Sequence, residues 1–224
     1  MAVAAKIKKM ATDPKKDAVR LKVLEHFNRY PIERFMSLPA ECWDIEDVVL
    51  SKGGHVIAFE KKAEIAKKIE DKRFSIGVIE SIISYPILGK GRRKNPAEVL
   101  CSGACTLIKE NLRRFLEHMP EAVLGNYGRW DGAWVDLCGC FGKTDNADTN
   151  YIMENLHKGL SSMESIPIAI GFLCNRDKDP EMKSRSKRLK KALELLGKHR
   201  DFEMLDYLPY MSTSPMMVIL GEYL

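Results

Sequence analysis

The stretch Trp130–Gly139, Trp-Asp-Gly-Ala-Trp-Val-Asp-Leu-Cys-Gly, is the part of the chain that most constrains its fold. Apolar residues run into one acid, Asp136, and a glycine follows three residues later. This pattern predicts a buried strand that delivers a carboxylate to its carboxyl end. In open α/β sheets ligands bind at that edge, so Asp136 is either a loop-capping residue or part of a binding site.

Strand and helix patterns alternate on both sides of this stretch. Helical periodicity covers about 14–30, 45–50, 61–72, 96–118, 149–163 and 181–200. Short apolar runs typical of strands cover 35–38, 55–59, 74–79, 134–135 and 166–173, and the tail at 202–210 and 215–223 has the pattern of a hairpin. This alternation predicts a doubly wound, mainly parallel sheet. Because no helix separates the last two strands, at least one of them must be antiparallel.

The composition predicts a globular protein that stays inside the cell. Hydrophobic residues make up 45% and charged residues 30% of the 224 positions, an ordinary balance for such a domain. No apolar run approaches the roughly 20 residues that span a bilayer, and the N-terminus lacks a secretory signal, so we expect a cytoplasmic location and no membrane. The six cysteines include no Cys-x-x-Cys pair, which predicts reduced, mostly buried thiols and no metal site.

The net charge of +5 conceals a segregation of basic residues. Residues 181–200 carry eight Lys or Arg against two Asp or Glu, and residues 89–94 include Lys90, Arg92, Arg93 and Lys94. Such segments suit a polyanion, so nucleic acid is an expected partner. The alternative is that these residues are only the solvated face of a helix and a charged loop.

Five βα units, an acid ending the second strand, an acid ending the fourth strand and a closing hairpin resemble one family. It is the class I S-adenosylmethionine-dependent methyltransferases, and the resemblance covers about Phe35 to Leu224. It implies a methyltransferase-like α/β domain over 31–224, after a basic N-terminal segment and leading helix over 1–30. The implied sheet is doubly wound, mainly parallel and seven-stranded, with a C-terminal antiparallel hairpin. The implied cofactor is S-adenosylmethionine.

The resemblance also implies a set of cofactor-binding residues. The loop after the first strand would contact the methionine part of the cofactor, and the acid after the second strand would bind the ribose hydroxyls. Residues 79–82 would contact the adenine, and the fourth strand would supply an acid. The corresponding residues are Leu38, Pro39, Ala40, Glu41, Glu60, Glu80, Ser81, Asp136 and Leu137. The family's glycine-rich signature after the first strand is absent, and Leu38 to Trp43 stand in its place. A modified loop that still binds and a loss of cofactor binding are therefore both open.

Each acid also has a purely structural interpretation. Glu60 begins a charged segment, where an acid often only balances a helix dipole, and the same holds for Glu46 in the preceding helix. Asp136 is the stronger functional candidate, because an acid directly after Ala-Trp-Val must be satisfied or exposed in a cleft. As the catalytic residue, Asp136 would orient the acceptor or the cofactor amine.

Three alternatives to this chemistry remain at the level of sequence. RNA cytosine-5 methyltransferases use cysteines after the fourth and fifth strands, where this chain has Cys138, Cys140 and Cys174. A catalytically inactive methyltransferase-like module could bind nucleic acid through the basic segments alone. A nicotinamide-dependent dehydrogenase is disfavoured, because no Gly-x-Gly-x-x-Gly follows the first strand.

Overall fold

The structure is a computed structural model of the chain. It describes residues 14–39, 43–73, 81–87, 95–102, 104–118, 129–140, 147–173, 182–211 and 215–224. In this part of the chain the strands are β1 (Arg34–Ser37), β2 (His55–Phe59), β3 (Ser81–Ile87), β4 (Asn95–Ser102), β5 (Cys105–Lys109), β6 (Gly132–Cys140), β7 (Ile166–Leu173), β8 (Phe202–Met211) and β9 (Pro215–Tyr223). The helices are α2 (Pro14–Phe27), α3 (Asp44–Ser51), α4 (Ala63–Arg73), α5 (Leu112–His118), α7 (Ala147–Asn155), the 3-10 turn η2 (Leu156–Gly159) and α8 (Met182–Leu196). None of these helices is long and apolar enough to cross a membrane.

The described strands form a single sheet of nine, in the order β3-β4-β5-β2-β1-β6-β7-β9-β8. The central strands β5, β2, β1, β6 and β7 run parallel to one another. Strand β9 is antiparallel to β7 and to β8, which gives the predicted closing hairpin. Seven of the strands thus form the doubly wound, mainly parallel arrangement that the sequence predicted, and the number of strands is corrected to nine.

The two additional strands form an antiparallel hairpin, β3–β4, at the β5 edge of the sheet. The sequence analysis assigned 96–118 to one helix, which is wrong before Leu112. The strand predicted over 74–79 lies outside the described residues. The third strand of the parallel core is instead β5, whose Thr106 to Ile108 are buried beside β2. A short apolar run can follow either period, and its burial between two strands decides in favour of the sheet.

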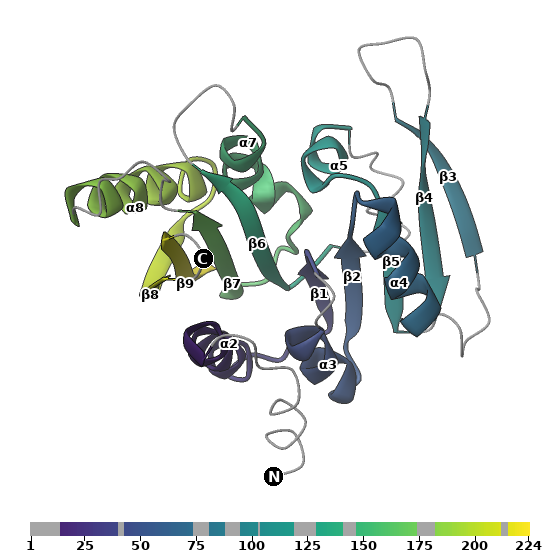
Figure 1. Cartoon of the computed structure of the whole chain (residues 1–224), viewed down its shortest axis with the longest axis horizontal. Helices are drawn as coiled ribbons and strands as arrows, with labels where there is room; N and C mark the ends of the chain where they lie inside the picture. Colours follow the sequence, from purple (N-terminus) through teal and green to yellow (C-terminus); the bar gives the residue numbers. More distant parts are fainter. Residues whose placement is uncertain are drawn as a thin grey trace.

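Helices cover both faces of the sheet (Figure 1). Each strand sends alternate side chains to the two faces. On one face, Phe35 and Ala169 pack with the buried residues of α2 and α3. On the other, Met36, Val135 and Ile170 pack with those of α5, α7 and α8. From β1 the chain continues to β2 and β5 on one side of the sheet, and β6 and β7 follow later on the other side of β1. The space outside the carboxyl ends of β1 and β6 is the topological switch point of the fold, where α/β proteins bind ligands.

The helix predicted over 149–163 ends early. It comprises α7 and η2 and stops at Gly159. A β-carbon at Gly159 would lie 1.8 Å from the indole of Trp130, so the chain turns where only glycine fits against that ring. The backbone then crosses Trp130 and enters β7, with Ser161 N donating to Trp130 O at 2.8 Å.

Candidate functional site

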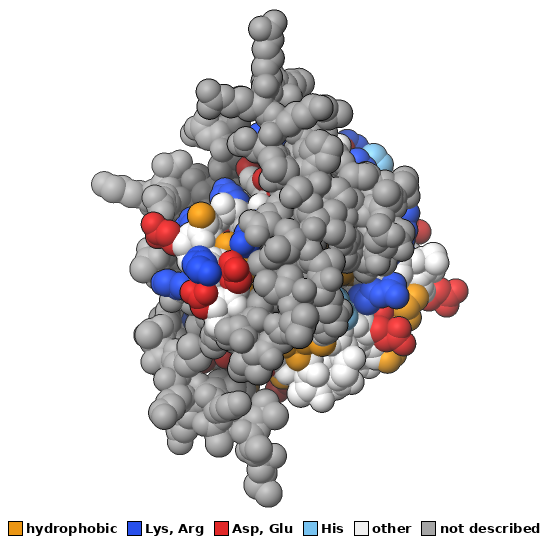
Figure 2. Space-filling view, turned by 90° about the vertical axis from the view of Figure 1, so that its right-hand side faces the viewer, with side chains coloured by type: hydrophobic (Ala, Val, Ile, Leu, Met, Phe, Trp, Pro, Cys, Tyr) orange, Lys and Arg blue, Asp and Glu red, His pale blue; other side chains and the backbone are white. Residues whose placement is uncertain are grey.

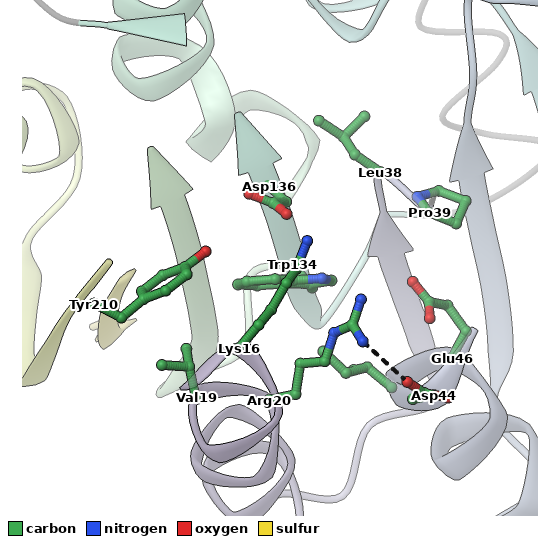
Figure 3. A pocket seen from close by; sticks show the side chains of 11 residues that line it. Lys16, Val19, Arg20, Leu38, Pro39, Asp44, Glu46, Trp134, Asp136 and Tyr210 are labelled. Carbon is green, nitrogen blue, oxygen red and sulfur yellow. Dashed lines mark ion pairs between the residues drawn. The ribbon is translucent and has the colours of Figure 1, made fainter. Parts of the chain in front are cut away.

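A pocket lies at the switch point between β1 and β6, on the face of the sheet covered by α2 and α3 (Figure 3). It is enclosed by the end of β1, the first turn of α3, the middle of β6, one side of α2 and one residue of β8. The lining residues are Lys16, Val19, Arg20, Leu38, Pro39, Asp44, Ile45, Glu46, Trp134, Asp136 and Tyr210. The structure therefore brings together three of the predicted site residues: Leu38, Pro39 and Asp136.

Asp136 reaches this pocket because β6 extends past the end of β1. The last bond between the two strands runs from Leu38 N to Trp134 O at 3.1 Å, and Asp136 lies two residues further along β6. Asp136 is thus within a strand that continues to Cys140, and not at the strand's end as predicted. Its carboxylate passes over Gly171 of β7, where a β-carbon would lie 2.8 Å from Asp136 Oδ1. Glycine at that position leaves room for the acid.

The electrostatic surroundings of Asp136 are mixed. Burial raises the pKa of Asp136 above its ordinary value, whereas the nearby charges of Lys16 and Arg20 act to lower it. Lys16 extends from α2 toward Asp136, and Arg20 forms an ion pair with Asp44 at 3.7 Å (Figure 3). A partly buried acid that faces a cavity and has a perturbed pKa is typical of a functional site.

Glu46 is the second buried acid of the pocket. It lies in the first turn of α3, is 2% exposed, and accepts a hydrogen bond from the hydroxyl of Ser37 at the end of β1. Burial raises the pKa of Glu46 to about 7, and the neighbouring charges of Asp47 and Asp44 act in the same direction. Glu46 therefore lines the pocket. Its position in the sequence was compatible both with such a site and with a role only at the helix dipole.

Glu60 lies at the carboxyl end of β2, as predicted, but it does not line this pocket. Its backbone N–H donates to Ile108 O at 3.1 Å, and its Oε1 accepts from the backbone N–H of Lys62 at 2.8 Å. The carboxylate thus supports the start of α4, which is the structural interpretation considered for it. The role of Glu60 in holding a ribose stays a prediction.

The other predicted cofactor residues are not brought together. Leu137 is 5% exposed and packs in the core on the opposite face of β6, since successive residues of a strand point to opposite faces. Ala40, Glu41 and Glu80 lie outside the described residues. Ser81 begins β3 and pairs with Cys101, which places it at the amino edge of the sheet, far from the ends of β1 and β6. The assignment of Ser81 to an adenine site is therefore wrong, because β5 and not 74–79 is the third core strand.

Several lining residues were missed by the sequence analysis. Lys16 and Arg20 are one turn apart on α2 and flank the stripe of Val19 and Val23 that packs on the sheet, so helical periodicity could have indicated them. Trp134 shares a face with Asp136, two residues away on the same strand. Tyr210 comes from β8, and no local pattern links it to the site.

Among the described residues, no group of three or more His, Cys, Asp or Glu is placed to hold a metal ion. Cys105 is a free, buried thiol in β5. Cys174 and the side chains of Cys138 and Cys140 fall outside the described part of the chain, so the cysteine-based alternative stays a hypothesis.

Solved structures with the same architecture are methyltransferases. The chain is similar to the N-methyltransferase NodS from Bradyrhizobium japonicum WM9 in complex with S-adenosyl-L-homocysteine, with a TM-score of 0.57, 5% identity and coverage of 99% of this chain and 96% of that one. This is the fold of the class I methyltransferases. A candidate rRNA methylase from Clostridium thermocellum has a TM-score of 0.53 and 12% identity, with 92% and 97% of the two chains covered.

Magnesium protoporphyrin IX methyltransferase from Synechocystis PCC 6803, with bound S-adenosyl-L-homocysteine, shares the same fold. Its TM-score is 0.53 at 9% identity, with 92% of this chain and 80% of that one covered. No protein-family model and no curated protein matches the sequence. The resemblance inferred from the order of strands and acids is therefore confirmed at the level of the fold.

Proposed function

We propose that this protein is an S-adenosylmethionine-dependent methyltransferase. The observation that carries the proposal is the Asp136 carboxylate, which faces a pocket at the β1–β6 switch point of a methyltransferase fold. The pocket presents the acids Asp44, Glu46 and Asp136 beside two bases, which suits a cofactor that carries a sulfonium, an ammonium and a carboxylate group. NodS and magnesium protoporphyrin IX methyltransferase, which share the fold, hold the demethylated cofactor.

Specific residues would hold the cofactor in this arrangement. Leu38 and Pro39 would contact the methionine part of the cofactor, and Glu60 would accept hydrogen bonds from its ribose hydroxyls. Ala40 and Glu41 follow directly in the chain and complete the same predicted loop. Glu110 directly follows β5 and replaces Glu80 as the residue beside the adenine, because the third core strand is β5.

Methyl transfer from this cofactor requires no covalent intermediate with the protein. S-adenosylmethionine supplies an activated methyl group when bound, so the chain has to align the acceptor and, where needed, take up its proton. Asp136 is placed to orient the acceptor or the cofactor amine. Burial raises the pKa of Asp136, which brings this carboxylate closer to the range in which a general base works well.

We further propose nucleic acid as the acceptor class. Strand β3 runs in the direction of the core strands, so its end at Ile87 and the start of β4 at Asn95 lie at the carboxyl edge of the sheet. The residues between them include four Lys or Arg within 90–94. On the side of the molecule that carries α4, described charges of both signs lie together (Figure 2). One ion pair of α4 is Lys67–Asp71, at 2.9 Å. The basic segments 89–94 and 181–200 are therefore the expected contacts for phosphates.

Isothermal titration with S-adenosylmethionine and S-adenosylhomocysteine tests the cofactor proposal. The wild type should bind both, and Glu60→Ala should bind at least tenfold more weakly, since a charge-assisted hydrogen bond contributes about 1.5–3 kcal/mol. Glu64→Ala, which removes an exposed acid from the first turn of α4, is the matched control and should leave affinity unchanged. Thermal melting separates a binding defect from loss of the α4 cap.

Two results would count against parts of this proposal. If the wild type binds neither ligand, the protein is not a methyltransferase, and the inactive nucleic-acid-binding module takes its place. If Glu60→Ala binds as the wild type does, the carboxylate serves α4 alone and the ribose is held elsewhere.

A further inference from the structure

Glu46 is a buried carboxyl group that opens onto a ligand pocket without a cation of its own. Its side chain lies between α3 and the end of β1, where the fully buried hydroxyl of Ser37 donates a hydrogen bond to it. Among the described residues, none forms an ion pair with Glu46. Burying an ionised carboxylate without a counter-charge is unfavourable, so below about pH 7 the group retains its proton unless a positive charge binds beside it.

The charges around Glu46 strengthen this preference. The charged and titratable groups that line the site are Asp44 from α3, Lys16 and Arg20 from α2, Asp136 from β6 and Tyr210 from β8. Asp47 lies outside the pocket and acts on Glu46 through its charge. Arg20 forms ion pairs with Asp44 at 3.7 Å and with Asp17 at 3.8 Å, and Lys16 extends toward Asp136 (Figure 3). Both bases therefore already face other acids. Asp44 and Asp47 disfavour a further negative charge on Glu46.

The proposed cofactor and its product differ in the charge that would meet this group. S-adenosylmethionine carries a sulfonium cation, and after methyl transfer the same sulfur is a neutral thioether. The adenosine and amino-acid parts of the two molecules are identical. A carboxyl that ionises in response to a cation in the pocket therefore distinguishes the two by charge alone.

We propose that Glu46 determines the selectivity of the pocket for the sulfonium cofactor over its thioether product, by releasing its proton to solvent when the cation binds. The inference rests on the proposed function, since it requires the cofactor to occupy this pocket. Loss of the positive charge during the reaction then returns Glu46 to its protonated form. The pocket then binds the thioether product more weakly than the cofactor, which favours exchange of the product for a new cofactor molecule.

The experiment measures the dissociation constants of both ligands by titration calorimetry from pH 6 to pH 8. The ratio of the product constant to the cofactor constant is the relevant quantity, because titration of groups common to both ligands cancels in it. Since the pKa of Glu46 lies at about 7, the ratio in the wild type should rise by about tenfold over this range. Calorimetry in buffers of different ionisation enthalpy should show more protons released by the cofactor than by the product near pH 6.5.

Glu46→Gln is the decisive variant, because it preserves the shape and the hydrogen bond to Ser37 but cannot ionise. Its ratio should be independent of pH, and the difference in proton release should vanish. Glu64→Gln removes an exposed acid from α4 that does not line the pocket, and it should keep the behaviour of the wild type. A ratio that does not change with pH in the wild type, with both ligands bound, overturns this inference and leaves the proposed function intact. Absence of binding by either ligand at every pH overturns both.

Discussion

At the scale of single residues, Glu46 gives a stability prediction that needs no ligand. Burial raises the pKa of this acid from 4.5 to about 7, so the folded state binds its proton more tightly than the unfolded state. The stabilisation from that proton is present below about pH 4.5 and is lost as the pH rises through about 7. In unfolding by urea, Glu46→Gln should gain about 2–3 kcal/mol over the wild type between pH 5 and pH 8.5.

The control for this prediction is Glu64→Gln, which removes an exposed acid of α4 and should show no such change between the two pH values. A constant difference between Glu46→Gln and the wild type would mean that Glu46 is solvated in the folded protein. The measurement thus tests the burial of the acid separately from its proposed role in ligand selection.

Single residues differ in how far their position could be predicted. Asp136 follows an apolar run, so its local sequence was enough to assign it to a site at the carboxyl edge. Leu137 was assigned to the same site because it is adjacent in sequence, but the two-residue period of a strand sends it to the opposite core. Glu46 sits in a helix whose other acids are more exposed, and only the contact with Ser37 identifies it as the buried one.

At the scale of elements, most boundaries follow from hydrophobic periodicity, and β5 is the instructive exception. The residues before α5 contain apolar positions at helical spacing, and the sequence extends that helix back to about Pro96. In the structure Leu107 and Ile108 are buried on opposite faces between β2 and β4. Whether such a run becomes a strand depends on neighbours that are remote in sequence, which local periodicity does not report.

The boundary between β5 and α5 depends on Asn111. Its Oδ1 accepts a hydrogen bond from Arg113 N at 2.9 Å, and its Nδ2 donates to Asp148 of α7 at 3.3 Å. Asn111→Ala removes the cap and one contact between the two helices, so it should lower the free energy of unfolding by about 0.5–2 kcal/mol. Asn111→Ser should restore part of the loss, because its hydroxyl oxygen can also accept from Arg113 N. An equal loss in the Ala and Ser variants would show that the cap is not the cause.

At the scale of the whole molecule, the doubly wound architecture followed from the order of elements, whereas the site required the folded chain. The order β5-β2-β1-β6-β7 brings β1 and β6 together, although about a hundred residues separate them in sequence. Tyr210 of β8 and Lys16 of α2 reach the same pocket from the two ends of the chain. No sequence window contains such a set, so only Leu38, Pro39 and Asp136 among its members were predicted.

The distribution of charge over the molecule leads to the last prediction, which concerns the proposed nucleic-acid partner. Strand β7 ends at the carboxyl edge of the sheet, and α8 follows it, so the first half of α8 is the part of that helix nearest this edge. Lys190 and Lys191 follow directly after this half and are exposed, whereas Ala192 and Leu196 are buried. A single-stranded oligonucleotide should bind more weakly as salt increases, because each neutralised phosphate releases counterions.

Replacing both lysines by glutamine should reduce the slope of log affinity against log salt by about 1.4 for single strands. The matched control replaces Lys67 and Lys68, two adjacent and exposed lysines of α4, where acids of the same helix lie close by. Because both double variants lose the same net charge, a general effect of charge changes the two slopes equally. A local contact with phosphates changes only the α8 slope. Equal slopes in the two variants would therefore argue that α8 presents a solvated basic face and does not hold the acceptor.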